Sequence, residues 1–249
     1  ASLGRLGVDV LVVYADREHS ANLAYLTGLD PRFEEALLLL DRRGRTLLLV
    51  GNECMGYLPD AQLRLAVELF QDFSLMGQPR GSSRPLRDIL ADFGLGAGTR
   101  VGCVGWKCYD ARLTGDSRHA SDLPSYLVDI LRELAGEARL VRNTTSLFTD
   151  PATGLRVVGL EPEQIAAFEY ASIQTSTSTL AVMRELREGV REDELERLLV
   201  AKGLPLSCHR MISFGEKARR GLASPGPNRA ALGDVFTIGY GVVGALSSR

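Results

Sequence analysis

Three short stretches of the sequence carry the side chains best suited to chemistry. Residues 16–19 (Asp-Arg-Glu-His) follow an apolar run, residues 30–35 precede another, and His209 lies in an otherwise apolar segment. A histidine can act as an acid, a base or a ligand, and ionised side chains can bind a charged substrate. Each stretch also has a structural interpretation, because residues 16–19 could cap a helix and His209 could be a hydrogen-bonded core residue. The residues alone leave both interpretations open.

The elements that position these stretches follow from the hydrophobic pattern. Continuous aliphatic runs predict buried strands at residues 8–14, 36–40, 46–50 and 100–104. Amphipathic stretches closed by glycine predict helices at residues 20–27, 84–93 and 124–134. Residues 41–44 have the length of a hairpin loop between two apolar runs. The first part of the chain is therefore expected to be an α/β domain with a mixed sheet.

A polar stretch at residues 143–159 marks the expected domain boundary, with domains at 1–150 and 160–249. In the second domain we predict helices at 161–187 and 192–201, an extended segment at 205–214 and a strand or hairpin at 233–246. The apolar side chains expected to form one buried face of the long helix are Ile165, Phe168, Ile173, Leu180, Met183 and Leu186. Because the sequence ends inside an apolar run, we expect the natural chain to continue past Arg249.

Composition excludes several classes of function. The formal net charge is −2, so the chain has no basic surface to attract nucleic acid, and no apolar run is long enough to cross a membrane. We therefore expect a cytoplasmic protein that binds neither nucleic acid nor membranes. Four cysteines are too few for a disulfide framework and are expected to be reduced and buried or half-buried. The glycines at 94–98 follow a helix and precede a strand, which is the wrong order for a dinucleotide loop and indicates a connecting turn.

Taken together, these motifs resemble a known family. Residues 16–30, 31–35 and 51–53 are similar to the N-terminal domain of the creatinase and aminopeptidase P family. The residues similar to the start of that family's pita-bread domain are Glu163, Gln164, Gly189, Glu192, Glu194, Leu195, Ser224, Pro225, Gly233 and Asp234. The resemblance implies an α/β chain in which a creatinase-like mixed-sheet domain precedes the first half of a pita-bread α+β domain.

The resemblance also implies a metal centre that this chain does not match. Most members of the family hold two divalent ions (Mn, Zn, Co or Fe) with two aspartates, one histidine and two glutamates, since hard carboxylates suit such ions and bridge them. Here the place of the first aspartate is Gly239, that of the second falls near Ser248, and that of a histidine is Leu222. We therefore expect no metal ligands and no metal cofactor in this chain.

The resemblance further suggests where a substrate would bind. An arginine in the family's loop that matches residues 30–35 can bind the substrate carboxylate, and a guanidinium fork suits a carboxylate. This assigns substrate binding to Arg32, with Phe33 and Glu34 beside it, and His209 is the candidate catalytic residue. A homodimer acting on a small-molecule or peptide substrate is expected from the same resemblance.

Three functions remain open. The first is a divergent creatinase/aminopeptidase P-like hydrolase of a peptide or related C–N bond. The second is a catalytically inactive pita-bread module that binds peptides or a protein partner. The third is a metal-independent amidinohydrolase or lyase that acts on a small polar metabolite, for which His209 would supply the acid or base.

Overall fold

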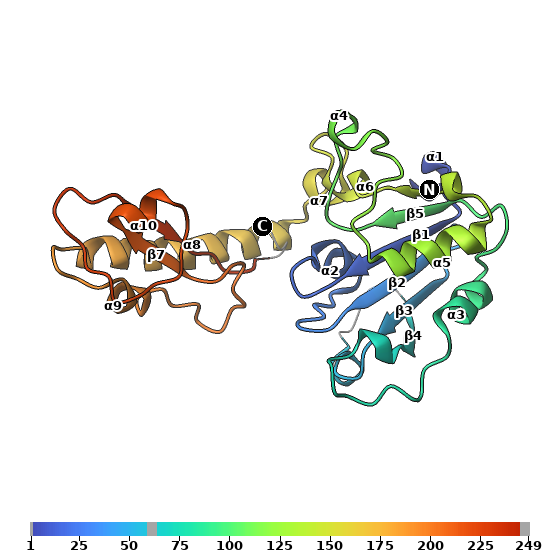
Figure 1. The fold of residues 1–249 in the computed structure, drawn as a ribbon, viewed down its shortest axis with the longest axis horizontal. Helices are drawn as coiled ribbons and strands as arrows, with labels where there is room; N and C mark the ends of the chain where they lie inside the picture. Colours follow the sequence, from blue (N-terminus) through green and yellow to red (C-terminus); the bar gives the residue numbers. More distant parts are fainter. Residues whose placement is uncertain (1, 59–63, 245–249) are drawn as a thin grey trace. The chain divides into compact units, whose positions relative to one another are not determined.

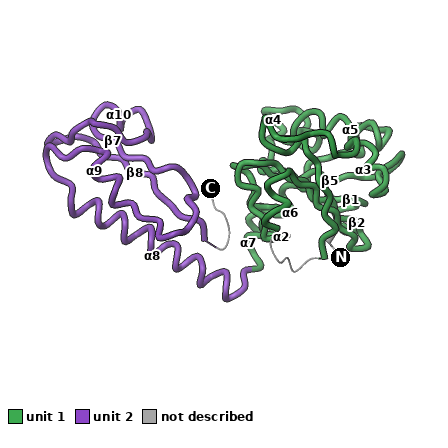
Figure 2. The backbone as a smooth tube through the Cα atoms, turned by 90° about the horizontal axis from the view of Figure 1, so that it is seen from below, with its two compact units in different colours: residues 1–159 green, residues 160–249 purple. Residues whose placement is uncertain are grey.

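The structure is a computed structural model that describes residues 2–58 and 64–244. The chain divides into two compact units, Ala1–Gly159 and Leu160–Arg249 (Figure 2). Each unit has its own sheet, so each is described separately.

Unit 1 is built on a six-stranded mixed sheet with the order β4-β3-β2-β1-β5-β6. The strands are β1 (Val10–Ala15), β2 (Ala36–Asp41), β3 (Thr46–Val50), β4 (Ala66–Leu69), β5 (Val101–Val104) and β6 (Val141–Asn143). The β1–β2 and β2–β3 pairs are antiparallel, and β3–β4, β1–β5 and β5–β6 are parallel. The predicted hairpin and mixed sheet are confirmed. The two short strands β4 and β6 were not predicted.

Helices cover both faces of this sheet (Figure 1). Helices α3 (Leu86–Phe93) and α5 (Ser125–Ala135) pack on one face, and α2 (Ala21–Thr27) and α6 (Ser146–Thr149) pack on the other. Along β1, successive side chains alternate between the two apolar clusters, as the two-residue period of a strand requires. The remaining short elements are α1 (Ser2–Leu6), α4 (Ala111–Thr114), α7 (Leu155–Val158), η1 (Cys54–Gly56), η2 (Gln71–Phe73) and η3 (Ala138–Leu140).

Glycines end the three main helices of unit 1 as predicted. Gly28, Gly94 and Gly136 have left-handed φ angles of 74°, 106° and 79°, which a residue without a Cβ adopts without strain. The loop that follows Gly94 leads directly from α3 to β5, so the glycines at 94–98 form a connecting turn as expected. This turn brings residues 94–99 next to the start of β1, since the backbone N–H groups of Asp9 and Val10 both donate to the carbonyl of Arg100.

The cysteine prediction holds for three of the four residues. Cys54 and Cys103 are buried and Cys208 is partly buried, but Cys108 is exposed, contrary to the expectation. The sequence places Cys108 after a strand, in a loop whose backbone stays at the surface. All four thiols are free.

Unit 2 combines one long helix with a two-stranded antiparallel sheet. Its elements are α8 (Pro162–Glu185), α9 (Glu192–Glu196), β7 (Met211–Phe214), α10 (Gly215–Arg219) and β8 (Phe236–Gly239). A capping box between Glu161 and Gln164 starts α8. The second helix was predicted to reach residue 201 but ends at Glu196, followed by turns. The core of this unit consists of Val182, Val190, Leu195, Leu199, Ile212 and Phe214.

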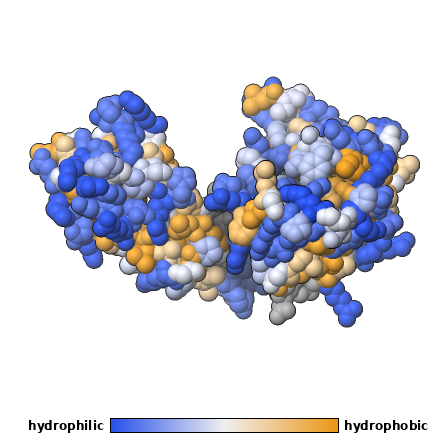
Figure 3. All heavy atoms as spheres, turned by 60° about the horizontal axis from the view of Figure 1, so that its bottom comes forward, coloured by the Kyte–Doolittle hydropathy of each residue, from blue (hydrophilic) through white to orange (hydrophobic). Residues whose placement is uncertain are grey.

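The predicted buried face of α8 is wrong. Ile165, Ile173 and Met183 are 52%, 53% and 59% exposed, and Figure 3 shows apolar side chains gathered on the surface of this unit. The side chains that α8 buries are instead mostly small or polar: Ala171, Gln174, Ser178 and Val182. Ser178 shows why this face is the buried one. Its hydroxyl accepts the backbone N–H of Val200 and donates to the carbonyl of Val200. Small residues let the backbone of the neighbouring segment approach closely.

In the part of the chain that the structure describes, no helix has the length and apolar character needed to cross a membrane.

Candidate functional site

The loop between α2 and β2 presents Arg32 at the surface of unit 1. Arg32 has a left-handed φ of 60°, which is uncommon for a residue with a side chain. The Asp30 carboxylate accepts its backbone N–H at 2.9 Å, and its guanidinium lies 4.6 Å from the centre of the Tyr57 ring. The Tyr57 hydroxyl in turn donates to the carbonyl of Pro31 at 3.1 Å. Arg32 is therefore held on an aromatic face with its charge exposed to solvent.

The two residues that follow Arg32 are placed differently from each other. Phe33 is 47% exposed beside Arg32, whereas Glu34 is buried. The Glu34 carboxylate accepts the backbone N–H groups of Glu53 and Cys54 at 3.1 and 2.9 Å, and so caps the short helix η1. The described contacts of Glu34 hold the loop in shape, and its role in substrate binding stays a prediction.

A polar cluster that sequence reasoning missed lies where β1 ends and β2 begins. The Tyr14 hydroxyl donates to the Glu35 carboxylate at 2.6 Å. Burial raises the pKa of Glu35, and burial together with the Glu35 carboxylate raises the pKa of Tyr14. The pairing of Ala15 with Ala36 brings these two strand ends together. A prediction of this antiparallel register would have placed Tyr14 next to Glu35.

The stretch at residues 16–19 forms a turn just before α2 and does not cap that helix, contrary to its structural interpretation. The Asp16 carboxylate accepts the backbone N–H groups of Glu18 and His19, both at 2.8 Å, whereas Ser20 forms no side-chain cap. The His19 ring also stacks on Trp106, with 4.2 Å between ring centres. The contacts of Asp16 and His19 therefore hold the turn that precedes α2.

The two-stranded sheet of unit 2 has one apolar face and one mixed face. Ile212 and Phe214 of β7 belong to the core of the unit. On the opposite face, Ser213 and Thr237 share a hydrogen bond of 2.8 Å between their hydroxyls, and Met211 is paired with Gly239. This second face carries the position where the resemblance places an aspartate.

The structure brings Gly239 and Leu222 together. A Cβ atom on Gly239 would lie 2.7 Å from the methyl carbon of Met211 and 3.5 Å from both methyl carbons of Leu222. A thioether and an alkyl group are poor ligands for hard divalent ions, so these residues do not fit the family's metal pair. Within residues 2–58 and 64–244, no group of three or more His, Cys, Asp and Glu side chains is placed to hold a metal ion. Ser248 lies outside the described residues.

Comparison with known proteins identifies the fold. No protein-family model and no curated protein matches the sequence. The structure matches a prolidase from Pyrococcus horikoshii with a TM-score of 0.67 and 17% identity, over 98% of this chain and 59% of that one. It matches an X-Pro aminopeptidase from Thermotoga maritima with a TM-score of 0.63 and 15% identity, over 98% and 60% of the two chains. The fold is that of the Xaa-Pro peptidases.

The match confirms the predicted fold class, an N-terminal mixed-sheet domain followed by part of a pita-bread domain. A Xaa-Pro dipeptidase from Bacillus anthracis is also similar, with a TM-score of 0.62 and 13% identity, over 98% of this chain and 59% of that one. The chain thus spans about three-fifths of the length of the structures that share its Xaa-Pro peptidase fold.

His209 is exposed, so its interpretation as a core residue is wrong. Within the described part of the chain its imidazole has no hydrogen-bond partner. The segment that carries it lies between a bridge of Leu206 with Val242 and the pair of Met211 with Gly239. Four residues, 207–210, lie between these two pairs on the first side and only two, 240 and 241, on the second, so residues 208–210 form a bulge. In the Xaa-Pro peptidase fold, His209 is thus presented on a bulge next to the Met211–Gly239 pair.

Glu192 is the buried carboxylate that organises unit 2. It accepts the backbone N–H groups of Phe214 and Gly226 at 3.0 and 2.9 Å, and it also pairs with Lys217 and Asn228. Burial opposes its ionisation, but these four donors outweigh burial and lower its pKa. The sequence marked Glu192 as a family motif residue, and the structure shows that it ties α9 to β7 and to the loop at residues 224–228.

Proposed function

We propose that this chain is a creatinase/aminopeptidase P-like protein that binds a peptide or a related C–N compound of the kind Xaa-Pro peptidases act on. The observation that carries the proposal is that Met211 and Leu222 fill the space beside Gly239, on a fold shared with those enzymes. The fold supports a substrate of that class. The apolar side chains at this position support binding without a metal pair held there.

Arg32 is the residue that we assign to substrate recognition. Its guanidinium is exposed, carries no carboxylate partner among the described residues, and is oriented by the ring of Tyr57. A fork of N–H donors in this state suits the carboxylate of a peptide or small acid. Phe33 supplies an exposed aromatic surface next to it for an apolar part of the ligand.

The experiment is isothermal titration of the purified chain with a proline-containing dipeptide, together with metal analysis of the same sample. We expect binding without stoichiometric manganese, zinc, cobalt or iron. Replacing Arg32→Gln should weaken binding by about tenfold or more, since one charge-assisted pair is lost. Arg184→Gln, which changes an exposed arginine on α8, is the matched control and should leave the affinity unchanged.

Equal affinity of the wild-type chain and Arg32→Gln would refute the assignment of Arg32. Stoichiometric metal together with cleavage of the dipeptide would refute the proposal that the chain only binds its ligand.

Metal-independent hydrolysis is a second candidate, favoured by one observation. His209 is accessible on a bulge beside the Met211–Gly239 pair, where a free imidazole could transfer a proton. The test is product formation from a proline dipeptide or an amidino compound in the presence of a metal chelator. Turnover that persists in chelator and is lost in His209→Gln would support this candidate, and turnover that survives the substitution would exclude His209.

A further inference from the structure

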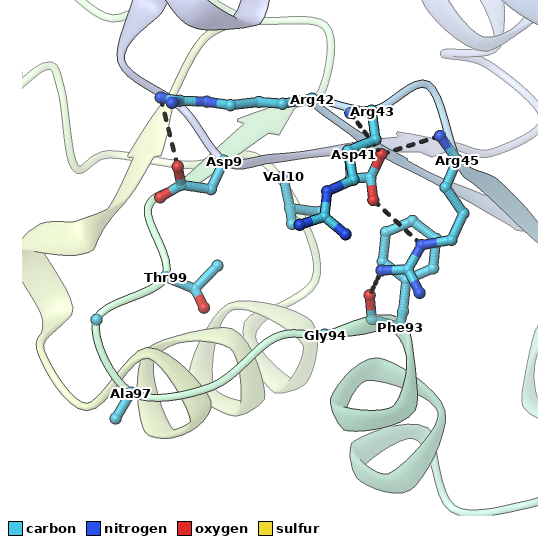
Figure 4. Close-up of a pocket in the computed structure, with 11 residues that line it drawn as sticks. Asp9, Val10, Asp41, Arg42, Arg43, Arg45, Phe93, Gly94, Ala97 and Thr99 are labelled. Carbon is cyan, nitrogen blue, oxygen red and sulfur yellow. Dashed lines mark hydrogen bonds and ion pairs between the residues drawn. The ribbon is translucent and has the colours of Figure 1, made fainter.

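A pocket of about 450 Å³ lies in unit 1 at the start of β1, the opposite end of that strand from residues 16–19. The turn between β2 and β3 forms one wall, and the end of α3 with the loop to β5 forms the other (Figure 4). Its side chains include three arginines, Arg42, Arg43 and Arg45, which face Thr99 and the apolar Phe93.

Two of the three arginines are fixed by partners within the pocket walls. Arg42 donates to the carbonyl of Val8 at 2.6 Å and lies 3.4 Å from the Asp9 carboxylate. Arg45 pairs with Asp41 at 3.1 Å, donates to the carbonyl of Phe93 and lies over the Phe93 ring, 4.4 Å from its centre. Their charges are therefore held in place at two sides of the pocket.

Arg43 is different, because its side chain has no partner among the described residues. Only its backbone N–H is bonded, to the Asp41 carboxylate at 2.9 Å. Figure 4 shows its guanidinium pointing into the pocket between Arg42 and Arg45. Across the pocket, the Thr99 hydroxyl accepts the backbone N–H of Gly96 at 3.0 Å, which leaves the hydroxyl proton free to donate.

The charges at this pocket do not cancel. The guanidiniums of Arg42 and Arg100 pair with the Asp9 carboxylate and that of Arg45 pairs with Asp41, so the Arg43 guanidinium has no carboxylate to balance it among the described residues. Hydrogen bonds from Arg100 lower the pKa of Asp9 to about 2, so both this carboxylate and its arginines stay ionised at neutral pH. The excess of positive charge therefore persists at neutral pH. The Arg43 guanidinium is the group whose N–H donors are available to a ligand.

We propose that this pocket binds the phosphate group of a small phosphate monoester. The donors come from several sides, with the arginines of the hairpin turn opposite Thr99, and this suits a tetrahedral anion better than a planar carboxylate. The volume exceeds that of the anion, and the exposed Ala97 lines the space left for the rest of the ester. The site is separate from Arg32 and does not depend on the proposed function.

The test is titration of the full chain with phenyl phosphate, followed by calorimetry and by the amide NMR signals of residues 94–99. Inorganic phosphate and acetate are titrated in parallel. We expect phenyl phosphate to bind most tightly, to shift the signals of this loop, and to lose about tenfold or more in affinity in Arg43→Gln. Thr99→Val should weaken binding less, because it removes one neutral hydrogen bond.

The matched control is Arg184→Gln, an exposed arginine of unit 2, which should bind phenyl phosphate with unchanged affinity. Equal affinity of wild type and Arg43→Gln would overturn the proposal, and so would an equal loss in Arg184→Gln. Acetate that binds as tightly as the ester would overturn the phosphate assignment. If inorganic phosphate bound more tightly than phenyl phosphate, the assignment of an ester as the ligand would be wrong.

Discussion

The sheet of unit 1 and helix α8 of unit 2 present apolar side chains in opposite ways. In unit 1, consecutive residues of β1 and β2 are buried on both faces, with Leu38 and Leu39 fully inaccessible. In unit 2, α8 leaves Ile165, Ile173 and Met183 more than half exposed. An apolar pattern therefore identifies an apolar face but does not reveal what covers it.

The two regions also differ in what holds them together. Two apolar layers bury the sheet of unit 1, whereas unit 2 has one small core and the buried carboxylate of Glu192 beside it. Breaking a buried ion pair by removing one partner leaves an uncompensated charge and unpaired amides. Unit 2 is therefore expected to depend on polar contacts more than unit 1 does.

The largest expected effect follows from Glu192. Replacing Glu192→Ala should destabilise unit 2 by about 3–5 kcal/mol, because Lys217, Asn228 and two backbone N–H groups lose their acceptor. Circular dichroism reports α8, the longest helix, while Trp106 is the only tryptophan and its fluorescence reports unit 1. A helical signal that melts early while the fluorescence transition stays in place would bear out the prediction.

The pH dependence of the stability of unit 2 provides a second test of Glu192. The pKa of Glu192 in the folded protein is lowered from its ordinary value of 4.5, so its ionised form adds stability above about pH 4.5. This contribution disappears as the pH falls through the lowered pKa. The helical transition of the wild-type chain should shift more on acidification than that of Glu192→Gln. Parallel shifts in both proteins would contradict the assignment.

The next largest loss of stability is expected for a truncation in the core of unit 1. Leu38→Ala empties a fully buried position between Val13 and Leu48 and should cost about 3 kcal/mol, monitored by the fluorescence of Trp106 under urea. The urea midpoint of the helical circular dichroism signal, which reports unit 2, should be the same as in the wild-type chain. A cost below about 1 kcal/mol would show that the two-layer description of unit 1 is wrong.

Gly239 tests the packing at the candidate site. Gly239→Ala should destabilise the two-stranded sheet by no more than about 1 kcal/mol, because the added Cβ would lie 2.7 Å from the Met211 methyl carbon, which ends a flexible side chain and can move aside. In the Met211→Ala background the same change should cost little or stabilise, since the clash is gone and alanine restricts the unfolded chain. The measurement is a double-mutant cycle by thermal unfolding. Additive effects at the two positions would exclude the contact.

The sequence predicted the main elements of unit 1 because their signals are local. Aliphatic runs and the glycine caps Gly28, Gly94 and Gly136 placed strands and helices within a few residues of their ends. The strands β4 and β6 escaped because they have four and three residues and include charged side chains. Such short strands are defined by their neighbours in the sheet and not by their own pattern.

The candidate site was less accessible to sequence reasoning, because its contacts are not local. The charged loop at 30–35 was recognised from composition, but the burial of Glu34 and the bond between Tyr14 and Glu35 depend on strand pairing. Leu222 lies beside Gly239, which is seventeen positions further along the chain, at the end of β8. Only the resemblance to a family indicated that these two positions belong together.

The smallest expected effect tests the exposed face of α8 directly. Ile173→Ala should change the stability of unit 2 by no more than about 0.5 kcal/mol, because about half of the side chain is already in water and alanine favours the helix. Val182→Ala, a fully buried position on the same helix, is the matched comparison and should cost about 2 kcal/mol. Thermal unfolding followed by circular dichroism measures both. A cost for Ile173→Ala that approached that of Val182→Ala would mean that this face is covered in solution, since only a buried isoleucine loses that much on truncation.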